Sequence, residues 1–191
     1  FGLSQIQAQE YDVILVAFNQ SYEAEYFQNY TEAIQQMDKI YISQSYEINL
    51  RLGWLHYQNA SYTKSESYYS KSVLLKPKSI EAKLGLANAY GALGSTDKLI
   101  ILYEDILKLD SKNSTANYRL AYILHSQRQM TKALEYITKV LVNYPFDFDS
   151  NVLAGKIYIS LGDITKAREV LQTAQIYNPK SIEISSLLKG L

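Results

Sequence analysis

The chain has 191 residues, 47% of them apolar, and its nineteen lysines and arginines balance nineteen aspartates and glutamates. Without net charge it has no global field to gather nucleic acid, an anionic membrane or an acidic substrate. It contains no cysteine, which excludes disulfides, thiolate metal sites and cysteine nucleophiles but leaves the redox compartment open.

Residues 1–10 carry little charge and are followed by a short apolar run. The first eight, FGLSQIQA, resemble the end of a secretory signal peptide cut after Ala8; the alternative is an N-terminal arm. This pattern favours an exported protein, periplasmic or secreted, over a cytoplasmic one. The apolar run Val13 to Phe18 is far shorter than the roughly 20 residues that cross a bilayer, so no transmembrane segment is predicted.

A 34-residue self-similarity organises most of the chain. Four windows follow one another in one register without insertion or deletion: 46–79, 80–113, 114–147 and 148–181. Each holds a small residue in its first half, namely Gly53, Ala87, Ala121 and Gly155. Twelve residues further on, a second, mostly small column contains Ser65, Leu99, Ala133 and Ala167.

Apolar residues recur at helical spacing in both halves of each window. In the third window Leu120 and Leu124 share one helix face, and Ala133 and Ile137 share another. Short breaks, such as the Gly-Asp pair at 162–163, are typical of a helix end followed by a helix cap. Each window therefore predicts two antiparallel helices, which the small columns allow to approach closely.

These columns resemble the tetratricopeptide signature W-x2-L-G-x2-Y…A-x3-F…P, which has the same 34-residue period. The last window matches well, with Ala154-Gly155, Tyr158, Ala167, Leu171, Ala174 and Pro179. The tryptophan column departs from the signature and holds Asn49, Lys83, Asn117 and Asn151. The resemblance implies an all-α fold, a right-handed α-solenoid of stacked antiparallel helix hairpins with a concave groove lined by the first helices.

The resemblance also implies a single domain over residues 11–191. Besides the four windows, this domain would contain a degenerate first repeat over 11–45 and a C-terminal capping helix over 182–191. In the first repeat Ala33 stands in the small column, but the first helix fits only if the register slips by two residues. Other helical repeats have other periods or an extra helix per unit, which the sustained period of 34 disfavours.

No set of residues in the sequence indicates catalysis. The two histidines, His56 and His125, lie in different windows, without metal-ligand spacing or an acidic cluster beside them. The glycines between Gly91 and Thr96 lack the lysine and the preceding strand of a phosphate-binding loop. Because no nucleophile, base and orienting group can be assembled, we expect neither an enzyme nor a cofactor or metal.

In the family, ligand-facing positions lie on the first helix of each repeat, and the resemblance carries them over residue by residue. The expected partner-binding groove comprises Arg51, Trp54, Tyr57, Asn88, Tyr118, Arg119, Tyr122 and His125. Aromatic pairs in this set are the kind of anchor that carries interface energy when buried. The chain has 18 tyrosines, however, so chance alone places some of them in the groove.

Two further expectations concern what the groove accepts. Small residues at Gly85, Gly91 and Ala92 are expected to leave room for a guest. Chaperone-binding members of the family grip a terminal carboxylate with a clamp of lysine, asparagine and arginine, and Asp149 stands at one of the matching positions. An acid at a position that requires a base disfavours a C-terminal carboxylate as the ligand.

Three function classes remain open from the sequence. The leading one is a non-enzymatic protein–protein interaction module, a scaffold or adaptor that binds a peptide or helix of a partner in its groove. An alternative is a structural or self-associating segment of a larger protein, with homo-oligomers as the product. The third, an RNA-binding helical repeat, would need a basic aromatic stripe, whereas the groove mixes both signs of charge, so no nucleic-acid partner is expected.

Overall fold

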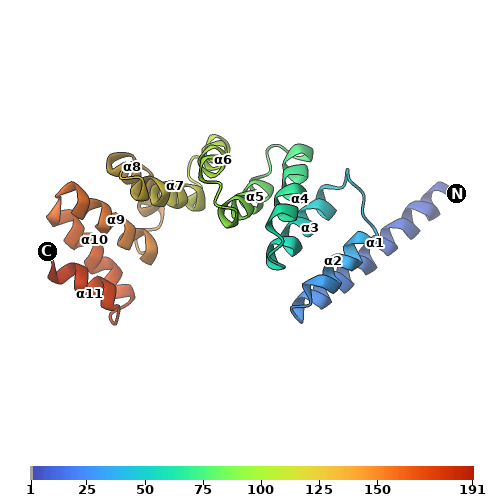
Figure 1. The fold of residues 1–191 in the computed structure, drawn as a ribbon, viewed down its shortest axis with the longest axis horizontal. Helices are drawn as coiled ribbons and strands as arrows, with labels where there is room; N and C mark the ends of the chain where they lie inside the picture. The colour runs from blue at the N-terminus through green and yellow to red at the C-terminus, as the bar shows by residue number, and fades with distance from the viewer. Residues whose placement is uncertain (1) are drawn as a thin grey trace. The chain divides into compact units, whose positions relative to one another are not determined.

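The computed structural model describes the backbone of residues 2–191 and the side chains from residue 11 onward. Over this range the secondary structure is α-helix alone, in eleven helices joined by short turns (Figure 1), which confirms the predicted all-α fold class. No helix of the described range has the length and apolarity to cross a membrane. The predicted signal-peptide remnant falls on residues 1–10, whose side chains lie outside the described residues.

The helices follow the chain in pairs, with a last helix on its own. Their bounds are α1 (Gly2–Tyr26), α2 (Tyr30–Asp38), α3 (Tyr46–Gln58), α4 (Tyr62–Leu75), α5 (Ile80–Ala92), α6 (Thr96–Leu109), α7 (Ser114–Ser126), α8 (Met130–Asn143), α9 (Phe148–Leu161), α10 (Ile164–Tyr177) and α11 (Ile182–Lys189). The chain divides into two compact units, 1–99 and 100–191, with the division inside α6.

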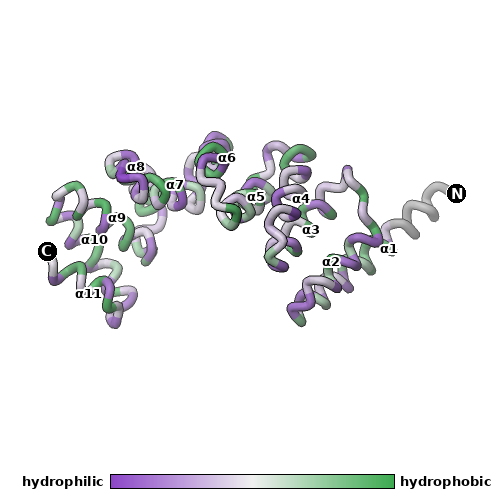
Figure 2. The backbone as a smooth tube through the Cα atoms, viewed as in Figure 1, coloured by the Kyte–Doolittle hydropathy of each residue, from purple (hydrophilic) through white to green (hydrophobic). Residues whose placement is uncertain are grey.

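Within each unit, helices pack on their neighbours in the chain. In the first unit α1 contacts α2, α2 contacts α3, and α3 contacts both α4 and α5. In the second unit α7 contacts α8, α8 contacts α9, α9 contacts α10, and α10 contacts α11. Figure 2 shows apolar and polar stretches alternating along these helices, as expected when one face of each is buried.

The starts of α3, α5, α7, α9 and α11 are each fixed by a capping side chain that recurs every 34 residues. Ser45, Ser79, Asn113, Asp147 and Ser181 each accept a hydrogen bond from the backbone amide three residues further on. Such a cap satisfies one of the amides that a helix start leaves without a partner, and it is worth about 1 kcal/mol. Each of these five helices therefore carries its own start signal.

A buried asparagine in the first turn of α3, α7 and α9 ties each helix to the loop before it. Asn49, Asn117 and Asn151 occupy the column where the tetratricopeptide signature has tryptophan, and at most 3% of each is exposed. Each donates from Nδ2 to the carbonyl of its own capping residue, at 2.6–2.9 Å, and to a second loop carbonyl, at 2.9–3.1 Å. In these loop-fastening asparagines, hydrogen bonds thus replace the apolar contact that the tryptophan of the signature makes.

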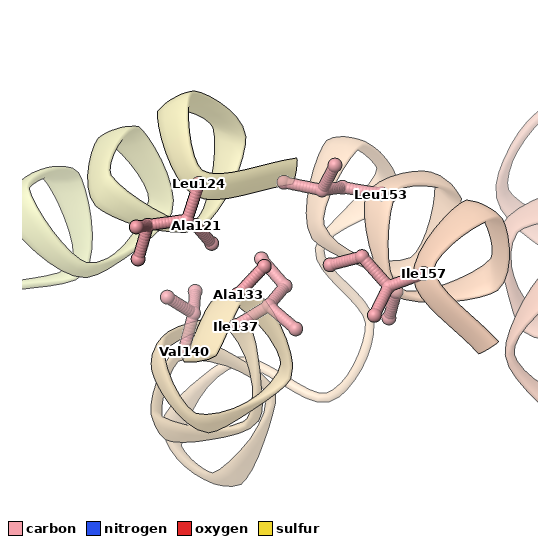
Figure 3. Packing of buried hydrophobic residues seen from close by; sticks show 8 residues of the cluster. Ala121, Leu124, Ala133, Ile137, Val140, Leu153 and Ile157 are labelled. Carbon is pink, nitrogen blue, oxygen red and sulfur yellow. The ribbon is translucent and has the colours of Figure 1, made fainter. Parts of the chain in front are cut away.

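The core of the second unit is built from small and branched apolar side chains of three helices. Figure 3 shows those from α7, α8 and α9 pointing toward one another: Ala121, Leu124, Ala133, Ile137, Val140, Leu153 and Ile157. The corresponding cluster of the first unit contains Ala33, Ile34, Met37, Ile48, Leu52 and Leu55 of α2 and α3. At the end of the chain Ile184 of α11 is fully buried with Leu171 and Ala174 of α10.

Tyr69 of α4 fills the space that two glycines leave open. Only 4% of it is exposed, and its ring would lie 2.8 Å from a Cβ atom added at Gly53 of α3. A Cβ atom at Gly85 of α5 would overlap the same ring. The expectation that Gly85 leaves room for a guest is therefore wrong, because an internal side chain already occupies that space. In the second unit Leu171 lies in the same way against Gly155.

A methyl group at Gly85 tests this packing. We expect Gly85→Ala to lower the free energy of unfolding by about 1–3 kcal/mol, since the Tyr69 ring must move. Gly91→Ala is the matched control: its Cβ atom would meet nothing closer than 4.0 Å, so the gain in helix propensity should raise stability by up to about 1 kcal/mol. Urea unfolding followed by circular dichroism measures both, and shifts of the same sign would contradict the packing described.

The loop-fastening asparagines allow a second test. We expect Asn151→Ala to destabilise the protein by about 1–3 kcal/mol, because the carbonyls of Pro145 and Asp147 both lose a donor. Asn143→Ala, at an exposed position of α8, should stay within about 0.5 kcal/mol of the parent. Thermal unfolding of the two variants distinguishes them, and equal melting temperatures would show that the buried asparagine contributes nothing.

Candidate functional site

A groove of about 840 Å³ runs along the first helices of the first unit, and we call it the N-terminal groove. It is lined by Phe18 and Tyr22 of α1, by Tyr46, Glu47, Leu50, Arg51 and Trp54 of α3, by Tyr69 of α4, and by Glu81, Leu84, Gly85 and Asn88 of α5. Aromatic and aliphatic side chains with a few polar groups are the usual lining of a ligand-binding cleft.

The repeat places equivalent positions of α3 and α5 in this groove. The second, fifth and ninth residues of each helix lie on one helix face, because they are three and four residues apart. On α3 they are Glu47, Leu50 and Trp54; on α5 they are Glu81, Leu84 and Asn88. Each helix therefore presents a carboxylate in its first turn and a leucine one turn further on.

Arg51 lies beneath the groove and binds α1 to α3. It is 7% exposed; its Nε and Nη2 atoms donate to Ser21 Oγ at 3.1 and 3.0 Å, and Nη1 donates to the Glu25 carboxylate. The guanidinium also stands 4.0 Å from the centre of the Tyr22 ring. The sequence suggested Arg51 as a direct contact for a partner, but its donors are engaged within the protein and Glu25 neutralises its charge.

Trp54 is one of the large aromatic side chains that the groove presents to solvent. It is 36% exposed, and its Nε1 atom donates to the second oxygen of Glu25. Its ring stacks on Tyr57, with ring centres 6.4 Å apart and an interplanar angle of 23°. Because the indole is held from two sides before any partner arrives, less rotamer freedom remains to be lost on binding.

A polar edge runs along the first turns of α3 and α5. The Tyr46 hydroxyl lies 2.7 Å from Ser79 Oγ and donates to Glu81 at 3.2 Å; burial raises the pKa of this hydroxyl, so it stays protonated. Lys76 Nζ lies 3.0 Å from Glu47 and over the Tyr46 ring. Hydrogen bonding to its own backbone amide, and then to Lys76, lowers the pKa of Glu47. The Glu47 carboxylate is therefore charged near neutral pH.

The second unit has a smaller pocket, the C-terminal pocket, of about 450 Å³. It is lined by Ser114, Thr115, Tyr118, Arg119, Val140, Tyr144, Asp147, Asp149 and Ser150. Arg119 and Asp149 are exposed, and Asp147 accepts a hydrogen bond from the Ser150 amide at 2.9 Å as the cap of α9. Burial, followed by the charge of Asp149, raises the pKa of Tyr118.

The eight residues expected in one partner-binding groove are distributed over several places. Arg51, Trp54 and Asn88 line the N-terminal groove, and Tyr118 and Arg119 line the C-terminal pocket. The other three, Tyr57, Tyr122 and His125, line neither of these depressions.

Those three residues have distinct surroundings. Tyr57 supports Trp54 from the side, and Tyr122 is 55% exposed. His125 is half-buried, and burial, followed by the charge of Lys156, lowers its pKa. The other histidine, His56, is a core residue: it is 5% exposed and stacks on Tyr68 with ring centres 5.2 Å apart.

Sequence reasoning missed the contribution of α1. Phe18 and Tyr22 line the N-terminal groove, and Glu25 holds both Arg51 and Trp54 from the same helix. The first repeat is degenerate and fits the 34-residue register only after a slip of two residues, so no ligand-facing positions were carried over to it. A signal was nevertheless present, since Phe18 and Tyr22 are four residues apart and share a helix face.

Comparison with known proteins identifies the repeat. Two family models described as tetratricopeptide repeat match the chain, one over residues 84–148 and the other over 46–79 and again over 148–181. The chain belongs to the tetratricopeptide repeat family. The resemblance drawn from the small columns and the 34-residue period is thus confirmed.

Individual relatives agree with this assignment. Anaphase-promoting complex subunit 3 of Dictyostelium discoideum is 29% identical over 109 residues, which are 56% of this chain and 11% of that protein. The chain thus spans only a small part of the length of this relative.

Solved structures share the fold. A crystal structure of MamA protein superposes with a TM-score of 0.77 at 19% identity, over 88% of this chain and 93% of MamA. A thermophilic tetratricopeptide protein of Thermus thermophilus gives 0.62 at 13% identity, over 92% and 97%. These structures show a shared fold.

The buried arginine under the groove provides a stability test. We expect Glu25→Gln to lower the free energy of unfolding by about 2–3 kcal/mol, because Arg51 would keep its charge without a counter-ion. Glu66→Gln, which breaks the more exposed pair with Lys98, should cost clearly less than Glu25→Gln. Chemical denaturation compares the two, and a Glu25→Gln cost no larger than that of Glu66→Gln would contradict the role assigned to this pair.

Proposed function

We propose that the protein is a non-enzymatic scaffold or adaptor that holds a peptide or a helix of a partner protein in the N-terminal groove. Membership of the tetratricopeptide repeat family supports a protein-interaction role in general. The match to a subunit of the anaphase-promoting complex, by its name a component of a larger assembly, agrees with such a role.

The observation that carries the proposal is the exposed face of Trp54 in the groove, together with the internal contacts to Glu25 and Tyr57 that hold this side chain in place. Tryptophan and tyrosine are enriched among the residues that dominate interface energies, and here Trp54 and Tyr22 are both exposed at the mouth. Leu50 and Leu84 lie beside them and are half-buried, so a partner side chain would complete their burial.

The lining of the groove suits a short segment better than a flat protein surface. Its lining comes from the first helices α1, α3 and α5, with Tyr69 of α4, and the rows on α3 and α5 share a glutamate followed by a leucine one turn later. A helix or an extended strand of a partner can lie across such rows and place side chains at regular intervals against them.

A random peptide library displayed on phage tests the proposal. Selection on the protein is expected to enrich peptides that alter the emission of Trp54, the single tryptophan of the chain. Trp54→Ala should weaken their binding by about 30-fold, or about 2 kcal/mol, as for other interface anchors. Affinities of the Trp54→Ala protein are measured by calorimetry, after circular dichroism has verified its folding.

Two further variants sharpen this test. Asn88→Tyr places a bulky side chain at an exposed position of the groove and should also weaken binding, with little effect on the fold. Tyr122→Ala, which removes an exposed tyrosine that does not line the groove, should leave affinity unchanged. If no peptide is enriched, or if the enriched peptides bind the Trp54→Ala and Asn88→Tyr proteins as well as the parent, the groove is not the binding site.

A further inference from the structure

The exposed charges that line the N-terminal groove are carboxylates. Glu47 and Glu81 occupy the second position of α3 and α5, one repeat apart, and both side chains are exposed. Carboxylates in the first turn of a helix are stabilised by the helix dipole. The groove thus has an acidic edge formed by two carboxylates that the repeat brings into register.

The cations near this edge are either engaged or loosely held. Arg51 is buried and paired with Glu25, so it offers no charge to a guest. Lys76 reaches Glu47 at 3.0 Å, but both side chains are more than half exposed, and a pair of this kind is readily exchanged for another cation. Glu81 accepts from the Tyr46 hydroxyl at 3.2 Å and forms no ion pair with the side chains described between residues 11 and 191.

Apolar surface lies one helical turn away from each carboxylate. Leu50 follows Glu47 on the same face of α3, and Leu84 follows Glu81 on α5, with Trp54 one turn beyond Leu50. When a guest peptide buries an apolar side chain against the two leucines and the indole, the peptide residues about one turn away from that side chain lie close to Glu47 and Glu81.

From this arrangement we propose that the N-terminal groove selects partner segments in which a lysine or arginine stands about one helical turn from a large apolar side chain. The inference rests on the proposed function and names its ligand class, a cationic amphipathic segment of a protein. An acidic segment or a terminal carboxylate would face Glu81. Among the lining residues that the structure describes, the one cation is Arg51, which is already paired with Glu25, so the negative charge of such a guest would be desolvated without a compensating partner.

The charge preference is tested with the same phage library, selected in parallel on three proteins. These are the parent, a Glu47→Gln/Glu81→Gln double variant, and Asp149→Asn, which removes an exposed carboxylate of the equivalent repeat position outside the groove. Glutamine at 81 keeps an acceptor for the Tyr46 hydroxyl, so the local fold is maintained. Peptides from the parent and from Asp149→Asn should be rich in lysine and arginine next to aromatic or aliphatic residues. Peptides from the double variant should keep the apolar residues and lose the basic excess.

A quantitative arm uses one enriched peptide, made synthetically with each basic residue and with glutamine in its place. On the parent, the glutamine peptide should bind about tenfold more weakly, whereas on the Glu47→Gln/Glu81→Gln protein the two peptides should differ by less than about twofold. The preference should also weaken as salt is raised, because the carboxylates are exposed. Trp54 emission reports binding throughout.

The outcomes separate this inference from the proposal on which it rests. Peptides that need Trp54 but are neutral or acidic, or whose basic preference survives in the double variant, would overturn the charge selection and leave groove binding intact. Failure to enrich any Trp54-dependent peptide would overturn both.

Discussion

The ring of Tyr69, lodged between two glycines, is the contact on which the first unit depends. Gly53 of α3 and Gly85 of α5 have no side chain, and the ring from α4 fills the space that they leave, so three helices meet at one aromatic residue. The same ring is part of the floor of the N-terminal groove. The spacing of α3 and α5, and with it the width of the groove, thus follows from a packing interaction that tolerates neither a larger residue at the glycines nor a smaller one at the tyrosine.

Around this contact, some residues stabilise the fold through internal contacts, and others stay exposed in the groove where a partner can contact them. Glu25 illustrates the division, since one carboxylate neutralises buried Arg51 and orients exposed Trp54. Several buried polar groups have internal partners: Ser21 accepts from Arg51, and the Nδ2 atoms of Asn49 and Asn151 donate to the carbonyls of their capping residues. The groove surface that remains exposed includes apolar area, the amide of Asn88 and the carboxylates of Glu47 and Glu81.

Much of the fold follows from local sequence. The period of 34, the small columns and the turn residues were sufficient to predict paired helices and the family, because each of these features acts within one repeat or between adjacent repeats. The site was less predictable. The repeat positions of Trp54 and Asn88 predict correctly that both line the groove. The burial of Arg51 could not be predicted in this way, because it depends on α1, where the register slips. The space at Gly85 was expected to be open for a guest, but a side chain from another helix fills it. The sequence shows that asparagines depart from the signature in the tryptophan column. Their hydrogen bonds to loop carbonyls, which only the structure shows, take over the role of the tryptophan in holding the helix to the loop.

The restriction of helix contacts to near neighbours in the chain has a kinetic consequence. Within each unit, the packed pairs join a helix to the next one or to the next but one, so few residues separate the partners in sequence. Closing short loops costs little entropy, and proteins with such low contact order reach the native state in microseconds to milliseconds. With a capping residue at the start of α3, α5, α7, α9 and α11, structure can nucleate at several places and spread to adjacent hairpins, so a nascent chain can begin to fold before its last repeat has been synthesised.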